Sequence, residues 1–560
     1  MIAQMEDFST NPTYLEVRRK FLESSGSNKA NLLELISRCL NYFPEESKTP
    51  YLGTNGDIDF SFSRKYENLP LLPQSDQSVL NGAMGFFQRS ILWHSPQALQ
   101  NITPPPALGA VAISTVANLY NLNLLWDYVS AGTQEAEQQI VRQISKLAGW
   151  GGTSDGVFTY GGKGCLTYAI RIGLNRCCPK VTKEGLNGVS PVVITTKFNH
   201  YIIESVCAWV GLGKDACIRV KTYADETIDF SNLREVLNKV LSENRPIACI
   251  ILSGGSTINL NIDRVDSARN VIEEVCSNFN LSYKPFIYFD TVVSWPWMFY
   301  KDYDFDKNEI KIPEKVFLRI KKAAELLKTS EYADAIGVDF HKIGFAPYNN
   351  SAFFVKNKSE LHSVVSDTPT TRERDVFGNN FLQHHTIEHS RSAAPVMAAW
   401  TILQSLGVQG FQMYIAQMMI VGDIFRDILP KYGFELLNPQ SLCYASIYYP
   451  IPPRGPKQFN KLQDSNIEST SYATQYIYEL SKFFSSGGYG SFDSIDVGFL
   501  KNLSKSKLGS DMSAIRIFPM SPHITIKEAE MISHQLGDMK KEFDKSFSYT
   551  KSDAPEVVHK

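Results

Sequence analysis

Short apolar runs recur along the middle of the chain, and segments with helical periodicity separate them. Within residues 156–355 these runs are rich in β-branched and aromatic residues, with few polar positions inside them. The runs cover residues 156–160, 191–195, 248–252, 286–289, 335–338 and 352–355. Strands that are apolar throughout are typical of a largely parallel sheet with helices on both faces. We therefore predict an α/β fold for this part of the chain.

The flanking regions have a different pattern. Residues 108–122 and 135–147 have apolar positions at helical spacing, and residues 393–430 indicate one long helix or a helix pair. From about residue 431 strands and helices alternate, as in a smaller α+β domain. The predicted organisation is a helical N-terminal segment (1–110), a large α/β domain (111–400) and a small C-terminal α+β domain (401–560).

Composition narrows the class of protein. The chain has 560 residues, of which 43% are hydrophobic, and its 56 basic and 58 acidic residues leave a net charge of -2. This balance predicts neither a nucleic-acid partner nor an anionic membrane partner. The nine cysteines form no Cys-x-x-Cys pair, so neither a metal site nor a disulfide framework is expected. The sequence starts without a secretory signal pattern, and charges interrupt the apolar residues 411–429, which predicts a soluble cytoplasmic protein.

A lysine stands at the mouth of the predicted sheet, in Asp339-Phe340-His341-Lys342. A lysine held away from bulk water loses proton affinity and becomes a nucleophilic amine. Chemistry on carbonyl groups needs such an amine. A pair of surface charges is the plain alternative for His341-Lys342 taken alone.

Other polar or small residues directly follow the earlier predicted strands. A glycine-rich turn at 161–164, with Lys163 inside it, precedes a predicted helix and is typical of an anion site. His200 can stack on a planar ring, Ser253 opens a small-residue turn, and Asp290 ends a buried strand, where a carboxylate needs a partner. The plain alternatives are an ordinary turn, a loop histidine and a helix cap. The order of these signals, each after a strand, is far more specific than any one of them.

The same residues resemble those of the group II pyridoxal-phosphate-dependent amino-acid decarboxylases, which have the type I aminotransferase-like fold. Ala333 to Lys342 is similar to the family's Ala-Asp-Ser-(x)₄-Pro-His-Lys, and Thr159 to Lys163 to its Thr-Ser-Gly-Gly-Thr. Further similar segments are His200 to Glu204, Ser253 to Thr257, Phe289 to Thr291, Thr133 with Glu137, His389 to Ser392 and Arg516 to Phe518. The resemblance runs from about His94 to Thr525, and it implies a mainly parallel seven-stranded sheet in the large domain.

The resemblance also implies roles for individual residues. Lys342 forms the Schiff base with pyridoxal 5'-phosphate, Asp290 pairs with its ring nitrogen, and His200 stacks on the ring as the third catalytic residue. The remaining cofactor-binding residues are Gly161, Gly162, Lys163 and Gly164 with His341 at the phosphate, and Ser253 and Thr291 near the ring. The implied reaction is decarboxylation of an L-amino acid to its amine, in a homodimer with shared active sites. Which amino acid is the substrate stays open.

Several residues depart from the family pattern. Lys163 replaces a hydroxyl residue, Thr291 replaces alanine, and Phe340 replaces proline. Residues 364–383, where many members carry a tyrosine that reprotonates Cα, contain none, although Phe377 lies there. Loss of that donor leaves His200, His384 or a loop residue of a partner chain for the task. It also opens two alternatives: oxygen-dependent decarboxylation to an aldehyde, and a catalytically idle dimeric homologue.

Overall fold

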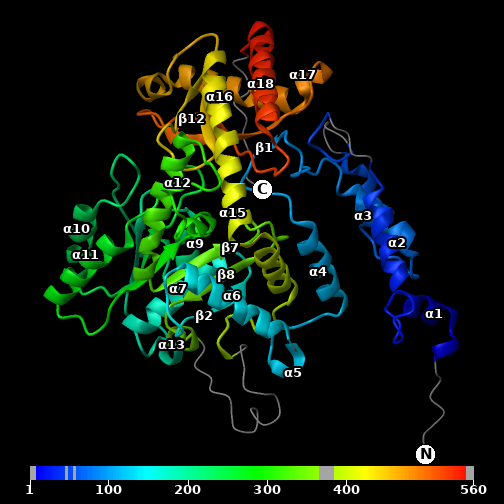
Figure 1. Ribbon diagram of the computed structural model, residues 1–560, viewed down its shortest axis with the longest axis horizontal. Helices are drawn as coiled ribbons and strands as arrows, with labels where there is room; N and C mark the ends of the chain where they lie inside the picture. The colour runs from blue at the N-terminus through cyan, green and yellow to red at the C-terminus, as the bar shows by residue number, and fades with distance from the viewer. Residues whose placement is uncertain (1–7, 44–47, 54–58, 131, 365–383, 550–560) are drawn as a thin grey trace, which may run out of the picture. The chain divides into compact units, whose positions relative to one another are not determined.

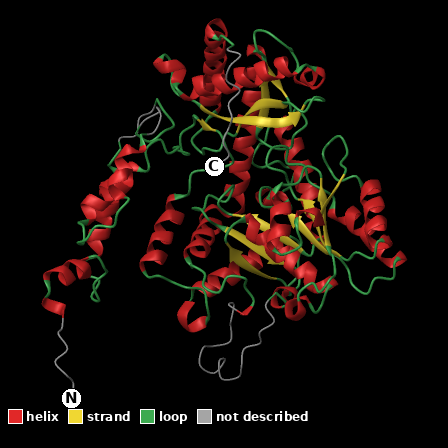
Figure 2. Ribbon diagram, turned by 180° about the vertical axis from the view of Figure 1, so that it is seen from behind, coloured by secondary structure: helices red, strands yellow, loops and turns green. Residues whose placement is uncertain are grey.

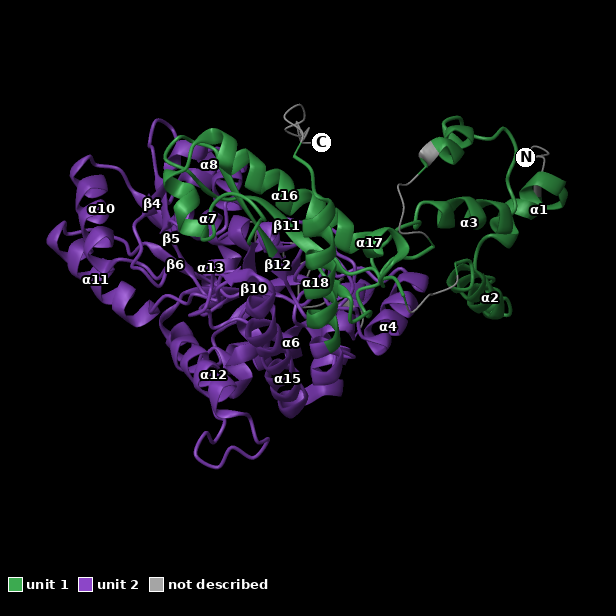
Figure 3. Ribbon diagram, turned by 90° about the horizontal axis from the view of Figure 1, so that it is seen from above, with its two compact units in different colours: residues 1–100, 451–515, 531–560 green, residues 101–450, 516–530 purple. Residues whose placement is uncertain are grey.

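The structure, a computed structural model, describes residues 8–43, 48–53, 59–130, 132–364 and 384–549. Residue contacts divide the chain into two compact units, which Figure 3 colours separately. Unit 1 comprises residues 1–100, 451–515 and 531–560, and unit 2 comprises residues 101–450 and 516–530.

A seven-stranded sheet forms the centre of unit 2, in the order β2-β8-β7-β6-β5-β3-β4. All its strands run parallel except β8, which is antiparallel to both β2 and β7. The strands are β2 (Asp155–Thr159), β3 (Val192–Thr196), β4 (Cys217–Val220), β5 (Ile247–Ser253), β6 (Phe286–Asp290), β7 (Ala335–Asp339) and β8 (Ser351–Val355). Six of them match the predicted runs to within one residue at each end. This confirms the α/β class and the mainly parallel sheet; the edge strand β4 was missed because it is short and contains Arg219.

Helices cover both faces of this sheet (Figures 1 and 2). Side chains of a strand alternate between faces, so Ile251 and Tyr288 pack in the cluster that contains α7, whereas Leu252 and Phe289 pack with α10, α11, α12 and α15. The α-helices of unit 2 are α4 (Leu108–Leu119), α5 (Asp127–Ser130), α6 (Thr133–Leu147), α7 (Gly162–Cys177), α8 (Val181–Glu184), α9 (Ile202–Trp209), α10 (Phe230–Ser242), α11 (Val265–Asn278), α12 (Glu314–Leu327), α13 (Lys358–His362) and α15 (Ala394–Ile428). Its 3₁₀ helices are η3 (Lys214–Ala216), η4 (Trp295–Tyr300), η5 (Lys328–Tyr332) and η7 (Leu429–Tyr432).

The helix α15 explains why the compact division differs from the predicted boundary at residue 400. It runs across that position and packs against α4, α6 and η4, so that residues up to 450 group with the large sheet. Gly407, with φ +59°, interrupts the helix, which agrees with the expectation of a long helix or a helix pair. An antiparallel pair, β9 (Phe434–Leu436) and β10 (Ser446–Pro450), follows it.

Unit 1 combines N-terminal and C-terminal residues. Strand β1 (Ala98–Leu99) is parallel to β11 (Asp496–Lys505), which neighbours β12 (Asp511–Ile517). Its helices are η1 (Phe8–Thr10), α1 (Pro12–Arg19), α2 (Lys29–Leu40), η2 (Phe60–Tyr66), α3 (Asp76–Gly85), η8 (Phe459–Asp464), α16 (Ile467–Ser485), α17 (Gly487–Gly490) and most of α18 (Ile526–Ser546). In the part of the chain that the structure describes, no helix is both long enough and apolar enough to cross a bilayer.

Candidate active site

The predicted site residues lie at one edge of the seven-stranded sheet, where the carboxyl ends of its parallel strands meet. Ser253 on β5 is in register with Asp290 on β6, and Asp339 on β7 is in register with Ser351 at the start of β8. Thr159, which precedes the glycine-rich turn, pairs with the same Ser351 from the other side. In open α/β sheets ligands bind at this edge.

Lys342 makes an ion pair at this edge. Its Nζ lies 2.7 Å from Oδ2 of Asp339, and the two side chains are 18% and 3% exposed. Burial alone lowers the pKa of Lys342, but the carboxylates of Asp339 and Asp290 outweigh it, and the pKa is raised. The expectation that this lysine loses proton affinity is therefore wrong: burial brings it beside two negative charges.

Asp339 is the hub of the polar contacts around the lysine. Ser351 Oγ donates a 2.5 Å hydrogen bond to its Oδ1, and Nε2 of His341 lies 3.7 Å from its Oδ2. Burial raises the pKa of Asp339, but Lys342 and His341 reverse the effect, so the pKa is lowered. The sequence pattern predicted no role for Asp339, although this residue ends β7 as Asp290 ends β6 and stands three residues before the lysine.

His341 is held firmly in this network. Its Nδ1 lies 2.9 Å from the carbonyl oxygen of Asn350, and its ring packs on Tyr348 with centroids 4.4 Å apart. Burial lowers the pKa of His341. With Nδ1 of His341 on the carbonyl oxygen of Asn350, the other ring nitrogen, Nε2, faces Asp339.

Asp290 has far fewer partners. Asp290 is 9% exposed, and among the described residues the side chain that bonds to its carboxyl is Tyr288, whose hydroxyl donates at 3.4 Å. The backbone N–H of Val292 also stabilises the carboxylate. Burial raises the pKa of Asp290 to about 6, and Lys342 lowers it in part. A buried carboxyl with so weak a partner is suited to a cationic group supplied from outside the chain.

The glycine-rich turn forms the start of α7. Gly161 has φ +122°, a conformation that glycine adopts readily, and Gly162 is the first helical residue. A Cβ on Gly162 would lie 3.6 Å from both carboxylate oxygens of Asp339, so the helix N-terminus is beside the Asp339 network. A Cβ on Gly164 would come within 2.1 Å of Thr159 Oγ1, so α7 packs against β2 as closely as only glycine allows.

Lys163 does not face Asp339. Its Nζ lies over the ring of Trp209, 4.5 Å from the centroid, as a cation–π contact. The backbone N–H groups of the first helical turn are therefore the donors that this turn offers to an anion.

His200 lies on the loop after β3. Its Nδ1 accepts a 3.1 Å hydrogen bond from the N–H of Ile202, and its ring stacks on Tyr201 with centroids 4.6 Å apart. The residue is exposed to solvent. Partial burial of the ring and the ammonium of Lys342 nevertheless lower the pKa of His200. The ring is thus neutral near pH 7 and close enough to the lysine to sense its charge.

Arg219 holds the His200 loop in place, a role that sequence reasoning missed. Its guanidinium donates to the carbonyl oxygens of Thr196, Lys197, Asn199 and His200 at 2.9–3.2 Å. It also pairs with Glu204 at 2.6 Å. A single arginine on a β-strand at that spacing carries no signal that distinguishes it from a surface charge.

Ser253 and Thr291 use their hydroxyls on the backbone. Ser253 Oγ donates to the carbonyl of Asn261 at 2.9 Å, and Thr291 Oγ1 donates to the carbonyl of Gly337 at 2.8 Å. These bonds shape the turns after β5 and β6. Contact of either hydroxyl with a cofactor stays a prediction.

A buried ion pair supports the strand before the glycine turn. Arg391 reaches Glu137 through two bonds of 2.6 and 3.1 Å, and Glu137 accepts a 3.0 Å bond from the N–H of Phe158. The two side chains are 5% and 0% exposed. Glu137 and Arg391 belong to two separate segments that resemble the family pattern, and the fold brings them together.

The loop that lacks tyrosine lies outside the described residues, which exclude 365–383 and therefore Phe377. Of the two histidines beyond it, His385 stacks on His362 with ring centroids 3.9 Å apart. Burial and the neighbouring His362 lower the pKa of His385 to about 4. The choice of a proton donor among His200, His384 and a loop residue stays a prediction.

These residues fit pyridoxal phosphate. The under-partnered Asp290 suits a ring nitrogen, the α7 N-terminus suits a phosphate, and Lys342 lies at the same edge. His200 follows β3, which is separated from β6 by β5, at the same edge of the sheet. The fit rests on the chemistry of this donor set.

Comparisons with known proteins agree with this fit. Residues 316–445 match the pyridoxal-dependent decarboxylase conserved domain. The chain is 22% identical over 420 residues to L-2,4-diaminobutyrate decarboxylase of Rhizobium meliloti (strain 1021), covering 73% of this chain and 75% of that protein. The crystal structure of mouse CSAD in apo form superposes with a TM-score of 0.73 at 15% identity, over 91% of this chain and 99% of that one. Rhodiola rosea 4-hydroxyphenylacetaldehyde synthase has the same fold, with a TM-score of 0.69 at 11% identity, over 95% of this chain and 99% of that one.

Proposed function

Because the chain belongs to the pyridoxal-dependent decarboxylase family, we propose that it removes the carboxyl group of an L-amino acid as CO₂ and releases the amine. The enzyme class is that of a carboxy-lyase that uses pyridoxal phosphate. The observation that carries the proposal is that Lys342 and the buried carboxyl of Asp290 lie at one sheet edge, close enough to shift each other's pKa. Among the described residues, the one side chain that bonds to Asp290 is Tyr288, at 3.4 Å.

The side chains have distinct tasks in this proposal. Asp290 holds a proton on the ring nitrogen of the cofactor, and the α7 N-terminus binds its phosphate. When bound, the cofactor withdraws electrons from the bonds at the substrate's Cα. Lys342 carries a proton that Oδ2 of Asp339, 2.7 Å away, stabilises, and this proton must leave before the amine can act as a nucleophile. His200 covers the ring from the β3 side, on a loop that Arg219 keeps rigid.

Borohydride trapping tests the assignment. Reduction of the cofactor-loaded enzyme, followed by peptide mapping, is expected to place the label on Lys342. A label on another lysine would overturn the assignment of that residue. A protein that takes up no cofactor would instead favour the catalytically idle homologue.

Which L-amino acid is the substrate is a separate question from the reaction type. A panel of L-amino acids, each read by CO₂ release and amine formation, identifies it. The diaminobutyrate decarboxylase relative makes L-2,4-diaminobutyrate the first amino acid to include.

We also propose a homodimer with shared active sites. Large apolar side chains of the N-terminal segment are open to solvent, with Leu69 and Leu71 97% and 98% exposed. Such residues suit burial against a second copy. Sedimentation is expected to show a dimer, and a stable, fully active monomer would contradict this.

A second candidate is decarboxylation coupled to oxygen, which the absence of tyrosine from residues 364–383 favours. In this reaction the amino acid, O₂ and water give an aldehyde, CO₂, ammonia and hydrogen peroxide. The aldehyde synthase among the solved structures of this fold supports including it. Amine formation without oxygen uptake would exclude it.

A further inference from the structure

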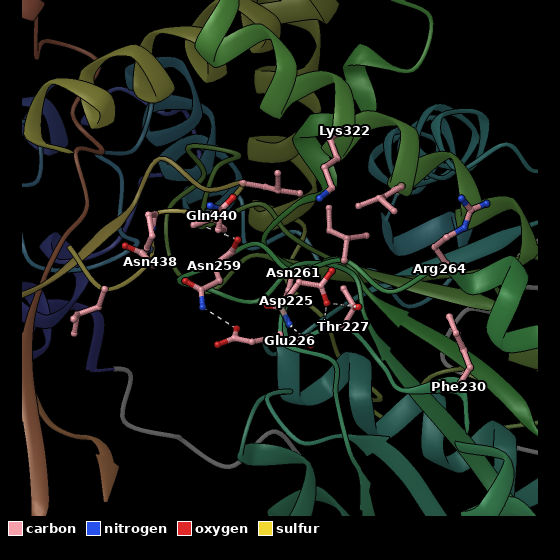
Figure 4. A pocket seen from close by; sticks show the side chains of 17 residues that line it. Asp225, Glu226, Thr227, Phe230, Asn259, Asn261, Arg264, Lys322, Asn438 and Gln440 are labelled. Carbon is pink, nitrogen blue, oxygen red and sulfur yellow. Dashed lines mark hydrogen bonds between the residues drawn. The ribbon is translucent and has the colours of Figure 1, made fainter. Parts of the chain in front are cut away.

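A pocket of about 390 Å³ lies in unit 2, apart from the candidate active site. Its walls come from the turn between β4 and α10, the loop after β5, helix α12 and the loop between β9 and β10 (Figure 4). Lys342, Asp290 and His200 are not among its lining residues.

Two asparagine side chains in this pocket each have a buried amide oxygen with no hydrogen bond to a described residue. Asn261 is 6% exposed, and its Nδ2 donates to the carbonyl of Glu226 at 2.9 Å, which fixes the amide so that Oδ1 points away from that bond. Asn259 Nδ2 donates to Glu226 Oε2 at 2.8 Å in the same way. Both Oδ1 atoms are buried without a partner among the described residues. An unpaired buried acceptor costs about 1–3 kcal/mol, and a donor on a ligand would remove that cost.

The charges around these amides are balanced. Asp225 bonds within its own turn to Thr227 at 2.6 Å, and Arg264 pairs with Asp266. Glu226 and Lys322 are then the charges left to face a ligand, with Lys322 across the pocket from the amides in Figure 4. No ion pair joins Lys322 to another described residue.

The ligand that these groups fit has an ammonium and a carboxylate. We propose that the pocket binds an L-amino acid with an apolar side chain, whose ammonium bonds to the oxygens of Asn259, Asn261 and Glu226. Its carboxylate pairs with Lys322, and its side chain packs on the apolar residues Phe230, Leu326, Leu437 and Leu442. A balanced pocket suits a net-neutral zwitterion better than it suits an amine cation. The inference is independent of the proposed reaction.

The pocket also adjoins the catalytic edge through the chain. The carbonyl oxygen of Asn261 accepts a hydrogen bond from the hydroxyl of Ser253, and the carboxyl of Asp263 accepts one of 2.7 Å from the N–H of Ser253. The loop that carries both asparagines therefore begins at a predicted site residue.

Calorimetric titration tests the proposal with three matched probes: L-leucine, 3-methylbutylamine, which lacks its carboxylate, and 4-methylpentanoate, which lacks its ammonium. The protein is the cofactor-loaded enzyme after borohydride reduction, which blocks the catalytic lysine, and the untreated enzyme in parallel. We expect leucine to bind the reduced enzyme at one site, and each of the other probes to bind at least about tenfold more weakly.

Variants locate that site. Lys322→Gln and Asn261→Leu are expected to weaken leucine binding at least about tenfold. Lys321→Gln is the matched control, because Lys321 lies over the ring of Phe305 instead. Lys322 is exposed, so its variant keeps the test valid if Asn261→Leu fails to fold. Absence of leucine binding at millimolar concentrations, binding unchanged in Lys322→Gln, or equal binding of the amine would overturn the proposal. Borohydride labelling reports separately on the proposed function, so each can fail alone.

Discussion

Asp290 and Asp339 end neighbouring parallel strands at the same sheet edge, and both are buried, yet their surroundings shift their acidity in opposite directions. Asp339 has Lys342, His341 and Ser351 around it, and its pKa is lowered. Asp290 has the hydroxyl of Tyr288 at 3.4 Å, and its pKa is raised to about 6. The sheet topology thus places two carboxyl groups at equivalent positions. Their neighbours decide which one has its hydrogen-bonding and charge requirements met within the chain.

The difference separates two functions. Asp339 is occupied within the chain, where it holds the lysine and the adjoining histidine in position. Asp290 can still accept hydrogen bonds, so it is the carboxyl that is available to pair with a bound cation. The predictions below each alter one side of this comparison.

Loss of the lysine should have the largest effect. Lys342→Ala is expected to reduce CO₂ release by about 10⁴-fold or more and to leave the cofactor loosely bound, because the covalent attachment is lost. The measurement is turnover at saturating cofactor, with retention of cofactor after gel filtration. An alanine variant with substantial activity would refute the proposed function.

Asp290→Asn is expected to reduce turnover about 100-fold or more, because an amide cannot keep the ring nitrogen protonated. Tyr288→Phe is the matched control, since it removes only the 3.4 Å bond to this carboxyl and should change turnover little. Similar turnover in Asp290→Asn and the wild type would remove the distinction between the two carboxyls.

Asp339→Asn should act mainly on stability. It leaves the Lys342 ammonium without its close counter-ion, and loss of one partner of a buried pair costs about 3 kcal/mol. Thermal unfolding of the cofactor-free protein measures the loss. Asp304→Asn is the control, because Asp304 forms an exposed pair with Lys307 at the same sequence spacing and 3.0 Å. Equal, small losses in both variants would contradict the hub role of Asp339.

The raised pKa of Asp290 predicts a pH dependence of opposite sign to that of ordinary carboxyls. Its pKa is about 6 in the folded, cofactor-free protein and about 3.9 when unfolded, so the folded state binds more protons between these values. The stability of the wild type relative to Asp290→Asn should therefore fall as pH rises from about 4 to about 6, by at most about 3 kcal/mol. Denaturant unfolding at several pH values measures this, and a constant difference would contradict it.

Thr291→Ala should have the smallest effect. It restores the alanine of the family pattern and removes the hydroxyl bond to Gly337, for a loss of about 1 kcal/mol in stability. If Thr291 also bonds to the cofactor, the absorption of the bound cofactor shifts as well. Unchanged absorption would confine this threonine to the backbone role.

Local pattern was enough to predict the strands and the edge at which the site forms. The predicted runs ending at Phe289 and Val338 contain no charged residue, and a carboxylate directly follows each of them. Their place in the sequence was therefore enough to predict that both carboxylates lie at the same sheet edge. The predicted direction of the Lys342 pKa shift was wrong, because the shift depends on how close the carboxylates of Asp339 and Asp290 lie to the lysine. The Arg219 clamp and the Glu137–Arg391 pair join residues far apart in sequence, and no single sequence records such distances.

The close approach at Gly164 also limits how this scaffold can be redesigned. Even a methyl group at position 164 would clash with Thr159. Helix α7 can therefore move to admit a bulkier ligand only by losing its packing against β2. Attempts to exchange the bound anion for another therefore have freedom at positions 162 and 163, but not at 161, where φ is +122°, or at 164. A library that randomises the whole turn will yield mostly unfolded protein, whereas one that keeps Gly161 and Gly164 will sample usable variants.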